Sequence, residues 1–305
     1  MKLGIIGGAG LLGSTTAFYA GVSGHLEEIK LLDIKDNMVM SHVMDMDQAV
    51  STLSATKISK AAYSDLGDCD IVLISASLPE RNVANRNEYL KGNLGLIVDI
   101  CDNLKKHTDM RDKIVINASN PVDVFNYVVW KLLGTKREKT LGFCLNDSVR
   151  FTWAIGKTLG RPYAAIDACC IGEHGEGQVP LFSQVKVDGK TRSFPPEERE
   201  TIRKTVATWF TEYQALQSGR TSGWTSAVGL ARMINAVASN SGEVMSCSMV
   251  LDGEFGQREL SIGVPVSLGS AGCGEFLLPP IDDAEKAGFA AAADKIRSLI
   301  HSIGF

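Results

Sequence analysis

Three side chains in the second half of the chain could together move a proton and bind an anion. His174 lies in the glycine-rich stretch IGEHGEGQVP. An imidazole titrates near neutral pH, so it could be a metal ligand, a packed loop residue or a base that moves a proton. Asp147 and Arg150 are three residues apart in LNDSVRF, a spacing that places both on one helix face. They could address one pocket or form a local surface ion pair, and the spacing leaves both open.

A second group of residues has the spacing of a dinucleotide-binding turn. Gly8, Gly10 and Gly13 follow the apolar run KLGII in the order G-x-G-x-x-G. In this pattern the glycines permit a tight turn, a close approach to a pyrophosphate, and close helix packing. The diphosphate then binds the free N–H groups of the helix start. Asp33 follows Gly13 by twenty residues, where a carboxylate accepts hydrogen bonds from ribose hydroxyls and repels a 2′-phosphate. The pattern favours NAD over NADP.

Alternating strands and helices must position these residues in the first half. The alternation predicts a parallel sheet with helices on both faces, the doubly wound Rossmann arrangement. Asn120 then lies at the carboxyl edge of a strand, where such sheets bind ligands, and Pro121 fits the first turn of the next helix. We expect strands at 2–6, 28–33, 71–75 and 113–119, helices at 11–22, 87–106 and 121–133, and an amphipathic segment around residues 39–50. The candidate cofactor-binding residues are Gly8, Gly10, Leu11, Leu12, Gly13, Asp33, Ile34 and Asn120.

The second half has a different pattern. We expect a helix opening within 141–151, a strand at 164–172 before His174, a small antiparallel sheet within 242–270 and a helix at 284–303. The chain therefore divides into an NAD-binding Rossmann domain (1–142) and an α+β substrate domain with an antiparallel sheet (143–305). A chain of 305 residues is long enough for two such domains.

Composition excludes several classes of function. A net charge of −4, without a Lys/Arg run, argues against a nucleic-acid partner. No run approaches the ~20 apolar residues of a membrane helix, so we expect no membrane partner. The seven cysteines are odd in number and lack the paired spacing of a zinc site, so we expect reduced thiols and a cytoplasmic protein.

The order and spacing of the motifs resemble the L-lactate and malate dehydrogenases. The agreement runs through nearly the whole chain, from IGGAGLLG through NASNPVDV, LNDSVRF and IGEHGEGQVP to LDGEFG. The resemblance implies hydride transfer between NAD and a small L-2-hydroxy acid or its 2-oxo acid. It also implies a homodimer or homotetramer, with the helix near 37–53 and the Asp147 helix close to a two-fold interface.

The same resemblance assigns roles to individual residues. It makes His174 the proton donor in reduction and the base in oxidation, with Asp147 accepting the other ring N–H and raising the imidazole pKa. It makes Arg150 the residue that binds the substrate carboxylate through two parallel hydrogen bonds. Asn120 then donates to the substrate oxygen, and Arg86 arrives on a mobile loop to polarise the carbonyl and expel water. We expect no metal at His174, because the cysteines and glutamates nearby form no zinc pattern.

The loop SLPERNVANRN departs from the family. Glu80 stands where malate enzymes typically carry arginine and lactate enzymes glutamine, and Arg81 follows it. An inward Arg81 favours a malate-like acid. An inward Glu80 repels a second carboxylate and favours a substrate with a cationic or hydrogen-bond-donating tail. A second departure lies in GRTSGWTSAVG, where Trp224 falls opposite the family's pocket threonine. Trp224 could narrow the pocket or pack in the core, or a small insertion could let Thr221 take the role of that threonine.

Two alternatives use the same fold. A catalytically idle NAD-binding sensor or scaffold would need none of Asp147, Arg150 and His174. An NAD-using glycosidase would need a cluster of cysteine and histidine metal ligands. We therefore predict an NAD-dependent L-2-hydroxy acid dehydrogenase acting on malate or lactate, with an unusual 2-oxo acid left open by Glu80 and Arg81.

Overall fold

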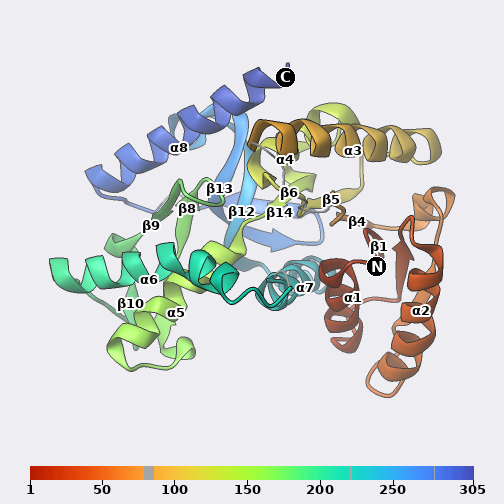
Figure 1. Ribbon diagram of the computed structural model, residues 1–305, viewed down its shortest axis with the longest axis horizontal. Coiled ribbons are helices and arrows are strands. Elements are labelled where there is room, and N and C mark those ends of the chain that lie inside the picture. The colour runs from red at the N-terminus through yellow and green to blue at the C-terminus, as the bar shows by residue number, and fades with distance from the viewer. Residues whose placement is uncertain (79–85, 220–221, 278) are drawn as a thin grey trace.

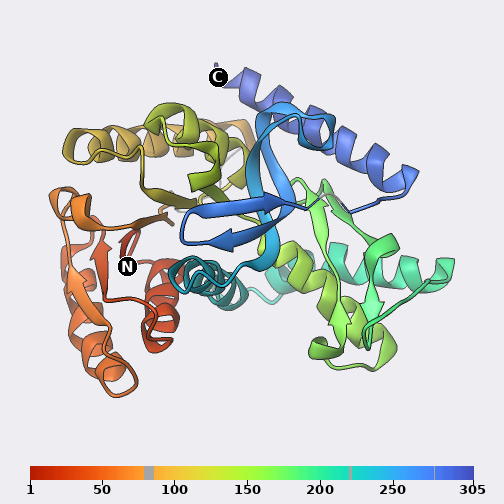
Figure 2. The ribbon, with the colours of Figure 1, turned by 180° about the vertical axis from the view of Figure 1, so that it is seen from behind.

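The computed structural model describes residues 1–78, 86–219, 222–277 and 279–305, with the side chains of 86–89 outside the description. It shows a twisted sheet with helices on both faces, extended on one side by a long hairpin (Figures 1 and 2).

The first half of the sheet is parallel, in the order β3-β2-β1-β4-β5-β6. This is the strand order of doubly wound dinucleotide-binding folds, as predicted. The four residues of each of β4, β5 and β6 are all buried, because helices cover both faces and select apolar runs. The strands are β1 (Lys2–Ile6), β2 (Glu28–Leu32), β3 (Lys57–Lys60), β4 (Ile71–Ile74), β5 (Ile114–Asn117) and β6 (Thr140–Phe143).

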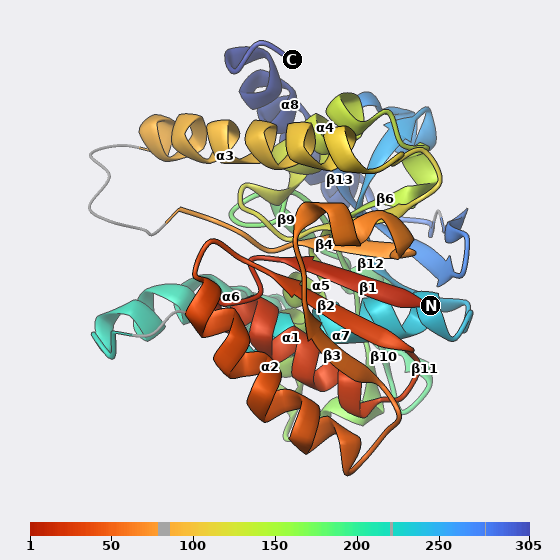
Figure 3. The same cartoon turned by 90° about the vertical axis from the view of Figure 1, so that its right-hand side faces the viewer.

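Helices cover the two faces of this sheet in two groups (Figure 3). One group is α1 (Leu11–Val22), α2 (Asp36–Ser51) and α7 (Trp224–Ala238); the other is α3 (Arg86–His107) and α4 (Val122–Leu133). The buried face of α1 carries glycine, alanine, serine and threonine, so neighbouring backbones can approach closely. The predicted helices at 11–22, 87–106 and 121–133 are confirmed. Pro121 is the N-cap of α4, which begins at Val122, so its predicted place in the first turn is wrong by one position. The Asn120–Pro121 peptide bond is cis.

The second half continues the same sheet. β12 (Glu243–Asp252) and β13 (Arg258–Gly269) form an antiparallel hairpin, and β12 pairs antiparallel with β6, with Ser248 opposite Gly142. The antiparallel prediction is confirmed, but a separate small sheet is wrong. Seven consecutive residues of β12, from 245 to 251, are buried, so the strand requires cover on both faces. β14 (Gly272–Phe276), β8 (Cys170–Gly172) and β9 (Gln178–Pro180) complete eleven strands within the described residues.

Two boundaries near the candidate site differ from the sequence analysis. The segment expected to open a helix at residue 141 is strand β6, and α5 (Leu145–Leu159) begins only after Cys144. Pairing with β5 and β12 on its two edges holds β6 extended. The strand expected at 164–172 is split into β7 (Ile166–Asp167) and β8, because β7 pairs with β10 in a different sheet.

The remaining elements enclose the end of the sheet that carries His174. α5 packs against α6 (Pro196–Ala215) over a second apolar cluster that includes Phe151, Phe182 and Ile202. α8 (Asp283–Ser302) packs along β9 and β13, as Figure 1 shows, and confirms the predicted C-terminal helix. β10 (Lys186–Val187) and β11 (Lys190–Thr191) complete a three-stranded sheet with β7.

We predict that the junction between β6 and β12 tolerates no side chain at Gly142. A Cβ there would lie 2.6 Å from Cβ of Ser248 and 3.0 Å from Cγ1 of Val122. Gly142→Ala should therefore lower the free energy of unfolding by roughly 1–3 kcal/mol, measured by urea denaturation.

Gly95→Ala is the matched control for this substitution. Gly95 lies within α3 with nothing within 4 Å of its added Cβ. Helix propensity predicts that Gly95→Ala is neutral or raises stability by up to about 1 kcal/mol. Equal losses in both variants, or none at Gly142, would contradict the packing argument.

Candidate active site

An imidazole–carboxylate pair forms where the turn after β8 meets the first turn of α5. Nδ1 of His174 lies 2.8 Å from Oδ2 of Asp147, and the two side chains are 16% and 6% exposed. An ionised carboxylate can only accept, so Nδ1 carries the hydrogen of this bond. The pairing fixes the ring orientation and leaves Nε2 as the ring nitrogen that can exchange a proton with a ligand.

The surroundings of His174 favour its charged form. Burial acts to lower the pKa of His174, but the charge and hydrogen bond of Asp147 and the charge of Asp123 outweigh it. The charge of Arg150 opposes them, and the net result is a raised pKa. The imidazolium therefore persists to a higher pH than that of a solvated histidine.

A second carboxylate anchors the backbone of His174. Oδ2 of Asp123, in α4, accepts the His174 backbone N–H at 2.7 Å, and Oδ1 accepts the hydroxyl of Ser248 at 2.5 Å. Burial raises the pKa of Asp123 to about 6, although the hydrogen bonds from Ser248 and His174 oppose the rise. This group makes the fold less stable as the pH rises from roughly 4 to 6, where the unfolded chain is ionised and the folded carboxyl is not.

Asp123 was not among the site residues predicted from the sequence. The available signal was a carboxylate in the otherwise apolar first turn of α4, flanked by Val122, Val124 and Phe125, all of them buried. A buried carboxylate needs partners, so its position in that run could have been noted.

The other side of the His174 turn is held by α8. Oε2 of Glu173 accepts the Gly177 N–H at 3.0 Å and lies 2.7 Å from Nζ of Lys295. Gly172 has φ +93°, and a Cβ there would lie 2.7 Å from the carbonyl oxygen of Gly177. The turn thus needs glycine at this position and is fixed by a half-buried ion pair.

Arg150 lies one turn after Asp147 on α5. Its guanidinium carbon is 4.5 Å from the centre of the Trp209 ring in α6. Among the described residues Arg150 makes no ion pair within 4 Å, and Asp147 pairs with His174. The simple surface ion pair between Asp147 and Arg150 is therefore wrong. Burial lowers the pKa of Arg150, but a guanidinium stays charged at any ordinary pH.

Of the other predicted substrate-binding residues, the structure describes the position of Asn120 fully and those of the rest in part or not at all. Asn120 is exposed just after β5, three residues before Asp123, on the segment that reaches His174. Arg86 begins α3, but its side chain is outside the described part. The alternatives Glu80, Arg81 and Thr221 also lie outside the described residues.

Trp224 can be placed. It begins α7 and is 59% exposed, so the core-packing alternative for this side chain is wrong.

The glycine turn after β1 is built for close packing. The backbone N–H groups of Gly7 and Gly8 donate to the Leu32 carbonyl at 2.9 and 3.0 Å, and Gly7 has φ +93°. A Cβ on Gly13 would overlap the carbonyl oxygen of Gly7, so the packing expected of the third glycine is present. The tight turn expected at Gly8 is made one residue earlier, by Gly7.

The start of α1 and the end of β2 provide the features that a dinucleotide requires. Gly10 is an exposed, extended N-cap before Leu11 and Leu12, and the first N–H groups of a helix lack helical acceptors. Oxygens of Asp33 accept the backbone N–H groups of Ala9 and Lys35 at 3.1 Å, which fixes the carboxylate and leaves lone pairs for ribose hydroxyls. Ile34 is 97% exposed beside it. These residues fit NAD.

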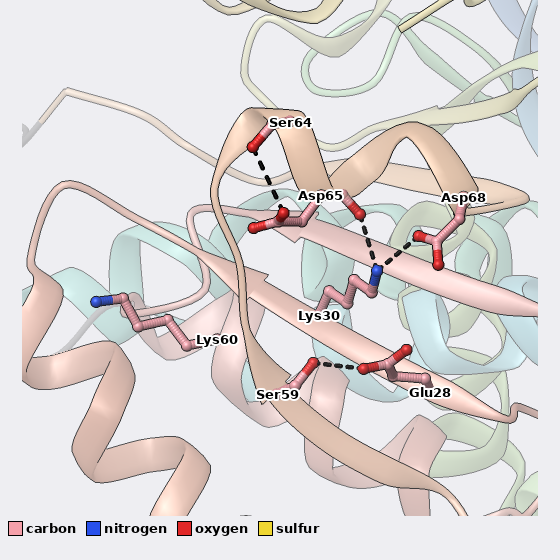
Figure 4. A pocket seen from close by; sticks show the side chains of 7 residues that line it. All are labelled: Glu28, Lys30, Ser59, Lys60, Ser64, Asp65 and Asp68. Atoms are coloured by element: carbon pink, nitrogen blue, oxygen red, sulfur yellow. Dashed lines mark hydrogen bonds and ion pairs between the residues drawn. The ribbon is translucent and has the colours of Figure 1, made fainter. Parts of the chain in front are cut away.

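We also searched the described residues for a metal site, a membrane-spanning helix and a second pocket. Within the described ranges, no three side chains of His, Cys, Asp or Glu lie together in a way that could hold a metal ion. None of the described helices combines the length and the hydrophobicity that a membrane span requires. A surface hollow of about 430 Å³ between β2, β3 and the short helix Tyr63–Asp68 lies apart from His174. In this hollow Lys30 donates to Asp68 and Ser59 donates to Glu28 (Figure 4).

Comparison with known proteins identifies the family. Residues 1–142 match "lactate/malate dehydrogenase, NAD binding domain", and residues 146–303 match "lactate/malate dehydrogenase, alpha/beta C-terminal domain". The chain belongs to the lactate/malate dehydrogenase family. A malate dehydrogenase of Haloferax volcanii is 32% identical over 305 residues, covering 99% of each chain.

Solved structures of this family share the fold. The malate dehydrogenase from Aeropyrum pernix superposes with a TM-score of 0.89 at 26% identity, covering 98% of this chain and 97% of that chain. A minor L-lactate dehydrogenase from Enterococcus mundtii gives a TM-score of 0.91 at 21% identity, covering 99% and 98%, and bears on the fold alone.

These matches confirm several predictions from the sequence. The fold class, the family, NAD as the cofactor and the assignment as an NAD-dependent 2-hydroxy acid dehydrogenase are confirmed. No match supports the idle sensor or the glycosidase.

We predict that alanine substitutions at Gly10 and Gly13 have different effects on stability and on NADH binding. A Cβ on Gly10 meets nothing closer than the Gly7 carbonyl oxygen at 3.3 Å, so Gly10→Ala should fold normally and bind NADH at least about tenfold more weakly, because the Cβ intrudes on the pyrophosphate. Gly13→Ala should lose both stability and NADH binding, because its clash is with backbone. NADH fluorescence titration and thermal unfolding separate the two, and a Gly10→Ala variant with unchanged affinity would argue against this binding mode.

Proposed function

We propose that this enzyme interconverts an L-2-hydroxy acid and its 2-oxo acid through His174, with malate and oxaloacetate as the preferred pair. The observation that carries the proposal is the 2.8 Å bond between His174 and Asp147, with Arg150 one turn further along the same helix. The choice of malate rests on the relatives, such as those of Haloferax volcanii and Dehalococcoides mccartyi, which are named malate dehydrogenase.

The proton transfer follows from the geometry of the pair. Bound NAD supplies the hydride donor or acceptor. Reduction leaves negative charge on the substrate oxygen, and the imidazolium of His174 delivers the proton from Nε2. Asp147 holds the ring and stabilises its charge before transfer, while Asp123 holds the backbone from which the ring extends. In oxidation, neutral His174 takes the proton from the hydroxyl.

Substrate orientation falls to three further residues. Arg150 makes no ion pair within the described chain, and its contact with the Trp209 ring face uses no N–H group, so we propose that it binds the substrate carboxylate. Asn120, at the carboxyl edge of the sheet, is proposed to donate to the substrate oxygen. Arg86 is proposed to polarise the substrate carbonyl.

A second candidate substrate class comes from the departure at Glu80. If Glu80 and not Arg81 faces the ligand, a 2-oxo acid with a cationic or hydrogen-bond-donating tail would bind better than oxaloacetate. Counting without a gap places Glu80 at this position, and a shift of one residue would place Arg81 there.

We also propose a cytoplasmic homodimer or homotetramer with an NAD-binding domain (1–142) and a substrate domain (143–305). Exposed methionines on α2 and the 42% exposed Trp153 on α5 support an interface at these helices, and seven free cysteines support a reducing compartment. The two family matches support the domain division. Sedimentation mass tests the assembly, and cell fractionation tests the compartment.

The direct test is NADH oxidation against a panel of oxaloacetate, pyruvate and larger or amino-bearing 2-oxo acids. We expect oxaloacetate to give the highest kcat/KM. His174→Asn should lower kcat by about 10²–10⁴ with NADH affinity retained, because the general acid is lost. His301→Asn, on the exposed end of α8, is the control and should match the wild type. A chain that binds NADH but turns over no member of the panel would refute the proposal.

The pH dependence of reduction tests the charge on His174. Reduction needs the protonated ring, so kcat/KM should fall as the pH rises through the raised pKa of His174. Asp147→Asn removes the main carboxylate that raises this pKa, so the fall should move to lower pH and kcat/KM at about pH 8 should drop tenfold or more.

Asp123→Asn provides a comparison for Asp147→Asn, because it should change the pH profile of kcat/KM less. It keeps an acceptor for the His174 N–H and removes the charge, so it should shift the profile in the same direction by a smaller amount. An alkaline limb that stays in place in both variants would contradict the assignment.

A further inference from the structure

We propose that Trp209 is a positioning residue that holds the Arg150 guanidinium ready for the substrate carboxylate, within an Arg150–Trp209–Tyr213 stack. This inference rests on the carboxylate-binding role of Arg150 in the proposed function. It assigns a part in substrate binding to α6, which none of the catalytic motifs includes.

The three side chains form a continuous stack between two helices. The guanidinium carbon of Arg150 lies over the Trp209 ring, 4.5 Å from its centre. The Trp209 and Tyr213 rings are 5.3 Å apart with planes 17° from parallel. Trp209 and Tyr213 are four residues apart on α6, so they lie above one another on one helix face.

Arg150 needs such support because its other contacts are few. Burial disfavours its charge, and in the described chain it has no carboxylate within ion-pair distance. The negative face of an aromatic ring offsets part of the cost of burying a cation. Contact with the ring face uses no N–H group in a hydrogen bond, so the donors remain free for a planar carboxylate.

The burial of α6 argues against a purely structural role for Trp209. Ile202 and Val206, earlier on the helix, are buried in the apolar cluster beneath α6. Trp209 and Tyr213 are half-buried, and the neighbouring Phe210 is 46% exposed. The ring of Trp209 therefore lies beyond the core, where it contacts Arg150 and Tyr213.

The test compares ring-retaining and ring-removing variants in steady-state kinetics of 2-oxo acid reduction. Trp209→Leu should raise the KM for the 2-oxo acid about 3- to 30-fold, the range of a desolvated cation–π contact, with smaller changes in kcat and in the KM for NADH. Trp209→Phe should recover most of the loss. Phe210→Leu, the adjacent exposed ring on the same helix, is the matched control and should leave both KM values unchanged.

A double-mutant cycle shows whether Trp209 acts through Arg150. In an Arg150→Gln background, Trp209→Leu should add little further loss, because the group that it supports is absent. Additive losses would indicate a general packing role and overturn the proposal. If Trp209→Leu lowers the unfolding temperature sharply, Trp209→Met offers a second ring-free side chain for the same comparison.

The outcomes separate this inference from the proposed function. An active wild-type enzyme whose KM is unchanged in Trp209→Leu overturns the positioning role alone. A wild-type chain that neither reduces nor binds any 2-oxo acid of the panel in the presence of NADH overturns the proposed function, and this role with it.

Discussion

The hydrogen bond between His174 and Asp147 is the interaction on which the rest of the site depends. Both side chains are largely withdrawn from water, where a charged imidazole is unfavourable without a partner. The carboxylate supplies that partner and also fixes the ring, so a single contact sets both the protonation and the direction of His174. Arg150 is placed by the same helix, since it follows Asp147 by three residues. One helix thus carries both the partner of the proposed proton donor and the proposed anion-binding residue, one turn apart.

The architecture serves to hold this contact from several sides. Asp123 reaches His174 from α4, and Lys295 reaches the same turn from α8. Asn126 of α4 donates to the carbonyl oxygen of Ser248 and to the hydroxyl of Ser261, which joins α4 to β12 and β13. Because β12 pairs with β6, the sheet is continuous from the glycine turn to the histidine turn. The candidate cofactor-binding turn and the candidate proton-transfer site are therefore held by one sheet.

Local features were predictable from the sequence, and features that depend on distant partners were not. The helix at 11–22, the close packing at Gly13 and the pairing of Asp147 with His174 follow from spacing, from glycine sterics and from the family resemblance. β6 was missed because its partner in β12 lies about a hundred residues away, and pairing on both edges overrides local propensity. The contact between Arg150 and Trp209 depends on how α6 crosses α5, which no local pattern records.

The pKa of His174 depends on its bond to Asp147, so a measurement of this pKa tests whether the bond stabilises the imidazolium. Chemical-shift titration of ¹³C-labelled imidazoles in the free protein measures it, and five histidines give a spectrum simple enough to assign with His174→Asn. We predict that His174 titrates above the ordinary value of 6.5 and that its Nδ1 keeps a hydrogen throughout the titration. A pKa at or below that value, or a neutral form with the hydrogen on Nε2, would contradict this prediction.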